Sequence, residues 1–285
     1  MTTLRALASD IRGAVGLAVL VLLCVLALLA PVIAPTDPAA QGDILQNRLL
    51  APLTLGSDGT KYWLGTDALG RDMLSRLVYG ARISLAVGFL SVAVSVLLGT
   101  VVGVASAVLG GVTERVLMAV TDTALALPRI VLLLALVALW EPSLVLVIFV
   151  LGFTGWMSIA RLTRAEVLGL LHRPFVEAAR VTGCGRLHLL MRHLLPNALT
   201  PIIVAAALAV GNAIMLEAGL SFLGLGVPAP APSWGNMIAS GRDALINAPW
   251  IATIPGLAIA LSVVSCNLLG DGLRDALDPR TRTTS

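Results

Sequence analysis

The chain has 285 residues, of which 58% are hydrophobic and only 12% are charged, and its mean hydropathy is +0.95. A soluble domain carries about 25% charged residues, so this composition excludes a water-soluble enzyme, a disordered protein and a collagen-like fibre. The formal net charge of +3 comes from 19 basic and 16 acidic residues. These values predict an all-α integral membrane protein.

Six stretches are apolar and long enough to cross a bilayer as helices, which needs roughly 20 residues each. The expected spans are residues 13–33, 84–108, 116–140, 142–160, 200–220 and 250–270. The first is longer than the apolar core of a signal peptide, usually about 7–15 residues, so a retained span is favoured over a cleaved one. The third is interrupted by Asp122 and by Pro128 followed by Arg129.

The distribution of basic residues predicts how the spans are oriented. If the N-terminus is cytoplasmic, twelve of the 19 basic residues fall in inner segments and six in outer ones, with Arg129 inside the membrane. Because basic residues are enriched in cytoplasmic loops, we expect both termini in the cytoplasm. We divide the chain into residues 1–82, which hold the tail, the first span and an outer segment, and residues 83–285, a five-helix core. The core contains an inner loop at residues 161–199.

Two kinds of chemistry are missing from the sequence. The only lysine, Lys61, follows Leu-Gly-Ser-Asp-Gly-Thr, which is not the Gly-x-x-x-x-Gly-Lys loop that cradles nucleotide phosphates. The three cysteines, Cys24, Cys184 and Cys266, show neither a disulfide framework nor a paired metal-ligand spacing. We therefore expect no nucleotide site, no cofactor and no metal in this chain.

The inner loop carries the most informative pattern. Proline is favoured at the first position of a helix and glycine just past its last, so Pro174 and Gly183 frame a predicted helix of about nine residues. Glu177 falls in its first turn, where a carboxylate complements the helix dipole, and it can pair with Arg180 three residues on. The two alanines between them leave a smooth spot for another surface. The residues alone also permit an interfacial helix that faces anionic lipid.

Glu-Ala-Ala at residues 177–179, Gly183, and His-Leu-Leu-Pro at residues 193–196 follow one another in this loop. This arrangement resembles the EAA loop of ABC importer permeases, in which the loop forms a coupling helix that docks into a groove of the ATPase subunit. His193 stands where that family usually has an aliphatic residue. The resemblance implies a coupling role for Pro174, Glu177, Ala178, Ala179, Arg180, Gly183 and Pro196.

Further motifs lie near both ends of the chain. They are LGTD at residues 64–67, EAGLSFLGLG at 217–226, NLLGDGLRD at 267–275 and LDPR at 277–280. Together they resemble the C-type permease subunit of dipeptide and oligopeptide importers, a subfamily that also contains nickel and glutathione importers.

The resemblance implies a type I ABC importer permease fold with six transmembrane helices, in a bacterial cytoplasmic membrane. The chain would form half of a translocation pathway for dipeptides or oligopeptides, with nickel or glutathione as the alternative substrates. The implied partners are a second homologous permease, one or two ABC ATPase subunits, an extracytoplasmic peptide-binding protein and membrane lipid, with no nucleic acid. ATP and Mg²⁺ would be used by the ATPase subunits, so the chain itself would not be an enzyme.

Charged residues within the predicted spans are candidate pathway or gate residues. Inserting a charge at the bilayer centre costs at least about 2.5–3.5 kcal/mol, so such a residue tends to face a cavity or a partner. Arg129 is either a cation that faces the pathway or half of a structural pair with Asp122. For Asp122 and Glu217 a structural role is favoured over a gate. Gly99 and Gly103 form a Gly-x-x-x-Gly pattern, which permits close helix approach.

A second class of function is a stand-alone carrier or a membrane enzyme. An intramembrane enzyme needs a catalytic set within the spans, yet the three histidines all fall in the inner loop: His172, His188 and His193. Transport by the purified chain without ATPase subunits would favour a carrier.

Overall fold

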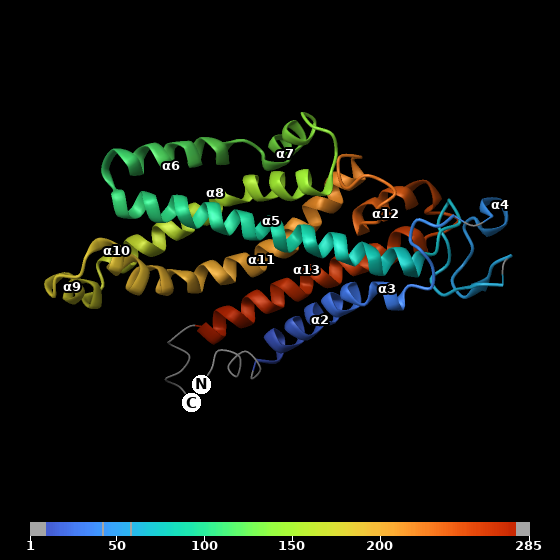
Figure 1. The fold of residues 1–285 in the computed structure, drawn as a ribbon, viewed down its shortest axis with the longest axis horizontal. Helices are drawn as coiled ribbons and strands as arrows, with labels where there is room; N and C mark the ends of the chain where they lie inside the picture. Colours follow the sequence, from blue (N-terminus) through green and yellow to red (C-terminus); the bar gives the residue numbers. More distant parts are fainter. Residues whose placement is uncertain (1–9, 42, 58, 278–285) are drawn as a thin grey trace.

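The computed structural model describes residues 10–277 except 42 and 58, and it is a bundle of long helices (Figure 1). Five of its helices are long and apolar enough to cross a membrane: α2 (Ile11–Leu28), α5 (Met73–Leu109), α8 (Leu144–Leu171), α11 (Leu195–Phe222) and α13 (Trp250–Leu277). The strands among the described residues are β1 (Thr54–Leu55) and β2 (Lys61–Tyr62), an antiparallel pair. The predicted all-α fold is confirmed. Most of the LDPR motif and three of the basic residues used for orientation lie outside the described residues: Arg5, Arg280 and Arg282.

The third predicted span is a bent pair rather than one helix. It consists of α6 (Gly111–Ala126) and α7 (Arg129–Val137), whose axes differ by 89°. Between them Leu127 is extended, with ψ at 133°, as expected for a residue that precedes a proline. The break therefore falls at the predicted interruption. With the pair counted as one crossing, the described part of the chain has six spans.

Helix α5 begins eleven residues before the predicted start of the second span. The Asp72 carboxylate accepts a hydrogen bond from the Ser75 amide at 2.7 Å and caps the helix. With 37 residues, α5 is about 55 Å long, well beyond the roughly 30 Å of a hydrocarbon core. Because α5 is longer than the bilayer is thick, we expect its first turns, with the charged Arg76 and Arg82, to extend beyond the membrane. Helix α5 also runs through residue 82, where we divided the chain, and that division stays a prediction.

The LGTD motif organises the outer segment. Asp67 accepts hydrogen bonds from the Arg71 amide at 3.0 Å and from Arg71 Nε at 2.7 Å, and Arg76 Nε lies 3.5 Å from the same carboxylate. The Thr66 hydroxyl donates to the carbonyl of Asn47, the last residue of α4 (Ile44–Asn47), at 2.6 Å. All these side chains are buried, so the motif folds the outer segment onto the start of α5.

Helices α5 and α8 approach closely through glycines. A Cβ added at Gly99 would lie 2.6 Å from Ile159 Cβ, and one added at Gly103 would lie 2.6 Å from Thr163 Cβ. Both distances are shorter than van der Waals contact, so only glycine permits this packing. The expected use of the Gly-x-x-x-Gly pattern is confirmed.

Replacing Gly103 with valine is expected to destabilise the protein by about 1–3 kcal/mol, because an overpacked contact forces helices apart. Gly169→Val is the matched control, since Gly169 is exposed on α8 and a Cβ there meets nothing within 4 Å. Thermal unfolding of the purified variants in detergent checks this. Equal midpoints for Gly103→Val and the wild type would contradict the packing.

The two ends of the bundle differ. The short helices α3 (Ala30–Ile33), α4 and α12 (Trp234–Gly241) lie at one end, and α9 (Pro174–Val181) and α10 (Arg186–Leu189) lie at the other (Figure 1). The helix sides between the ends expose large apolar side chains, such as Leu22, Leu97, Val101, Phe149 and Leu257. Such a surface suits contact with lipid or with another membrane subunit.

Candidate functional site

The predicted inner-loop helix is present as α9. It begins at Pro174 and ends at Val181, and Gly183 follows with φ at +82°, a left-handed conformation that favours glycine. The Cys184 amide donates to the Ala179 carbonyl at 3.0 Å, which closes the helix end. Proline and glycine thus bound the helix as predicted.

One side of α9 is held by the membrane domain. Val176 is fully buried in an apolar cluster that includes Val167 of α8 and Leu194, next to the start of α11. A helix of eight residues is marginal alone in water. This anchor therefore stabilises α9 and fixes which of its faces points outward.

The outward face of α9 exposes part of the predicted coupling loop. Glu177 and Ala178 are exposed and Ala179 is half-buried, while the side chain of Arg180 lies outside what the structure describes. Pro196 is exposed in the first turn of α11. Around them the loop exposes large apolar side chains, which are Phe175, Val181 (88% exposed), Leu187 (73%) and Met191. Apolar groups gathered at an end of the bundle mark an interaction surface.

A second feature is a cavity of about 330 Å³ among the spans, with a mostly apolar lining that also holds several polar side chains. Its polar lining comes from four helices and comprises Ser91, Ser95, Arg129, Ser158 and Asn212. Arg129 Nη2 donates to the Leu151 carbonyl at 3.3 Å, while its buried Nε has no hydrogen-bond partner among the described residues. A Cβ at Gly155 would lie 3.2 Å from Arg129 Nη2, so this glycine leaves room for the guanidinium.

Asp122 is not the partner of Arg129. Its carboxylate lies 3.8 Å from Arg161 Nη1 of α8, and both side chains are 61% exposed. The structural-pair alternative for Arg129 is therefore wrong, because α6 turns Asp122 toward α8. A stronger ion pair that the sequence did not reveal joins the same two helices, with Arg164 Nε donating to Glu114 Oε1 at 2.9 Å.

Glu217 is completely buried where three helices meet. Its carboxylate accepts hydrogen bonds from the Ser221 hydroxyl at 2.7 Å and from the Ser84 hydroxyl of α5 at 3.4 Å. The Ser84 hydroxyl in turn accepts from the Trp234 amide of α12 at 3.1 Å. The carboxylate thus connects α11, α5 and α12, which suits the structural role favoured for it.

Glu217→Leu is expected to destabilise the protein by about 1–3 kcal/mol, because the serine hydroxyls lose their buried acceptor. Glu217→Gln keeps one acceptor oxygen and should cost less. Thermal unfolding of both variants, measured alongside transport, checks this role. A Glu217→Leu variant that unfolds like the wild type but no longer transports would make this residue a gate instead.

Comparison with known proteins shows to which family this chain, with its loop around α9 and its cavity beside Arg129, belongs. Residues 95–283 match the family model described as binding-protein-dependent transport system inner membrane component. The chain belongs to this family of permeases. Residues 3–52 of this permease also match the N-terminal TM domain of oligopeptide transport permease C.

Several curated relatives align with nearly the whole permease. The di/tripeptide transport system permease protein DppC of Pseudomonas aeruginosa is 43% identical over 96% of this chain and 90% of its own length. The dipeptide transport system permease proteins DppC of Haemophilus influenzae and Escherichia coli are 40% and 44% identical over 95% of this chain, and over 92% and 90% of their own lengths. An inward-facing structure of the MetNI methionine ABC transporter matches with a TM-score of 0.61 at 22% identity, over 72% of this chain and 98% of that one. This last likeness shows the type I ABC permease fold.

Family membership makes the chain a multi-pass inner-membrane permease of an ABC transporter, not an enzyme. A permease of this family works with another permease, an ATPase and a substrate-binding protein.

Proposed function

We propose that this permease carries dipeptides and oligopeptides into the cytoplasm as half of an ATP-driven pathway. The observation that carries the proposal is its alignment, over nearly full length, with relatives named as dipeptide and di/tripeptide permeases. One or two ABC ATPase subunits bind and hydrolyse ATP with Mg²⁺, and this chain binds neither. An extracytoplasmic peptide-binding protein delivers the substrate.

In this proposal α9 is the coupling helix. Its buried Val176 ties it to the membrane domain, and its outward face with Glu177 and Ala178 meets the ATPase. When ATP closes the ATPase subunits, α9 moves as a rigid element and carries the spans with it, because packed interfaces switch between discrete states. The α9 end and both termini then lie in the cytoplasm, in agreement with the distribution of basic residues.

The cavity beside Arg129 is the proposed stretch of the pathway within this chain. Arg129 supplies a cation whose Nε has no hydrogen-bond partner in the described part of the chain, and serines and an asparagine supply hydrogen-bonding groups. A peptide's C-terminal carboxylate is the substrate group that such a cation attracts. In this proposal Arg129 interacts with that carboxylate as the peptide crosses the membrane.

Uptake of a labelled dipeptide by cells with and without the gene tests the substrate class. Unlabelled tripeptide, glutathione and Ni²⁺ serve as competitors, in a strain without other peptide importers. We expect uptake to depend on the gene and to be reduced by tripeptide alone. Unchanged dipeptide uptake on deletion, or competition only by glutathione or Ni²⁺, would contradict the peptide assignment.

A further inference from the structure

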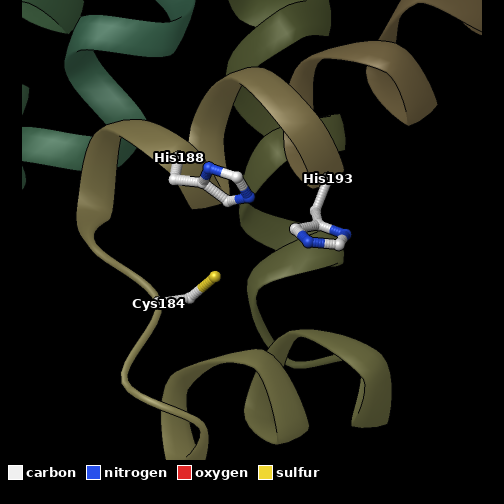
Figure 2. A group of neighbouring side chains, drawn as sticks. All are labelled: Cys184, His188 and His193. Carbon is white, nitrogen blue, oxygen red and sulfur yellow. The ribbon is translucent and has the colours of Figure 1, made fainter.

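Three metal-binding side chains meet where the inner loop turns into α11. They are Cys184, His188 and His193 (Figure 2), whose potential ligand atoms all lie within 4.8 Å of one another. Cys184 and His193 are half-buried and His188 is exposed. The sequence showed no paired ligand spacing, and the structure brings the three together through two local backbone features.

The first feature is a π-helical turn, η1 (Leu190–Leu194), between α10 and α11. On an α-helix with 3.6 residues per turn, residues five apart point in different directions. In the π turn the Leu195 amide donates to the Leu190 carbonyl five residues before it, so residues five apart lie one turn above the other. His188, in the last turn of α10, and His193, within η1, lie five residues apart at this turn, and their ring centroids are 6.2 Å apart. Such turns are rare and often occur at functional sites.

The second feature is the end of α9. Gly183 adopts its left-handed conformation and the Cys184 amide donates back to the Ala179 carbonyl, so the chain reverses directly before Cys184. Figure 2 shows the thiol pointing toward the two imidazoles. The third donor, the thiol of Cys184, therefore comes from the segment just after α9, and the cap at the end of that helix fixes its position.

We propose that Cys184, His188 and His193 bind a Zn²⁺ ion. A thiolate and two imidazoles are donors that Zn²⁺ prefers, whereas Mg²⁺ and Ca²⁺ require oxygen ligands. Tetrahedral Zn²⁺, with Zn–S of about 2.3 Å and Zn–N of about 2.0–2.1 Å, places its donors about 3.5 Å apart. The three side chains must therefore close by about 1 Å, which small rotations of an exposed histidine and a loop cysteine allow. Binding releases the thiol proton to solvent, and a water or a partner side chain fills the fourth position.

The bound ion would fasten the end of α9 to the base of α11. It would then restrict the helix proposed to couple this permease to its ATPase, and this consequence rests on the proposed function. The binding itself does not, since it depends only on the local geometry of the loop.

Zn²⁺ titration of the purified full-length permease in detergent, stripped of metal and competing with a chromophoric chelator, tests the site. We expect one Zn²⁺ per chain. Cys184→Ser, His188→Gln and His193→Gln should each weaken binding at least about tenfold, since each removes one of three ligands. His172→Gln, which changes the remaining histidine of the same loop, and Cys24→Ser, which changes a cysteine of α2, should bind as the wild type does.

Co²⁺ gives a second readout, because a cobalt–thiolate bond adds a charge-transfer absorption band. The band should appear with the wild type and disappear with Cys184→Ser, while both proteins unfold at the same temperature without metal. Equal Zn²⁺ affinity in the three ligand variants and the wild type, or no band, would mean adventitious binding and overturn the proposal. Peptide uptake is measured separately, so a failure of the metal-binding test says nothing against the proposed transport function.

Discussion

Glu177→Arg is expected to lower ATP-driven uptake at least about tenfold while the membrane helices stay folded. Glu177 is exposed on the outward face of α9, where it makes no ion pair within the described residues. Charge reversal there changes the surface offered to a partner, and like charges brought together at an interface cost several kcal/mol. It also removes a carboxylate that complements the dipole of α9 in its first turn, an effect of about 0.3–1 kcal/mol that leaves the membrane helices untouched. The readouts are uptake and the amount of ATPase that co-purifies with the permease.

Glu141→Arg is the matched control, because it makes the same change of charge at an exposed position in the connection between α7 and α8. It should leave both readouts near wild type. Glu177→Gln, which removes the charge without reversing it, should give an intermediate loss. Normal uptake and normal ATPase recovery with Glu177→Arg would refute the assignment of α9 as the coupling helix.

Arg129→Ala is expected to reduce peptide uptake by about tenfold while the complex assembles normally. The guanidinium lines the cavity among the spans, makes one hydrogen bond to the Leu151 carbonyl and has a buried Nε without a partner among the described residues. We therefore expect its removal to cost the fold little but to take a cation out of the proposed pathway. Arg129→Lys keeps the charge and should restore part of the uptake.

Uptake assays on variants with matched expression separate the two roles of Arg129. Arg242→Ala is the control, since Arg242 is exposed directly after α12, where its side chain lies beside Asp243. If Arg129→Ala lowers assembly or thermal stability in proportion to uptake, the arginine is structural. If the Arg129→Ala variant takes up peptide at the wild-type rate, Arg129 has no role in the pathway.

The elements that depend on local chemistry were predictable from the sequence. Pro174 and Gly183 predicted α9, and the restriction that Pro128 imposes on Leu127 predicted the break between α6 and α7. Apolar runs located the spans, since a bilayer demands a minimum length of helix. The start of α5 was missed because charged residues were taken as limits, although a helix can extend beyond the membrane.

The features that depend on how helices pack were not predictable. Asp122 pairs with Arg161, which lies on another helix, and no local pattern tells which helix α6 faces. The cluster around Cys184 was missed for a different reason. Residues five apart diverge on a regular α-helix, and the π turn η1, which begins after His188 and contains His193, leaves no signature in the sequence.

The central claim is that this chain moves peptide only when ATPase subunits drive it. The most direct test is uptake of a labelled dipeptide into proteoliposomes that contain this permease, its partner permease, the ATPase subunits and the binding protein. We predict uptake that requires ATP and that stops when the ATPase subunits are left out. Dipeptide uptake at the same rate by this chain alone, without ATPase or ATP, would contradict the account and make the protein a stand-alone carrier.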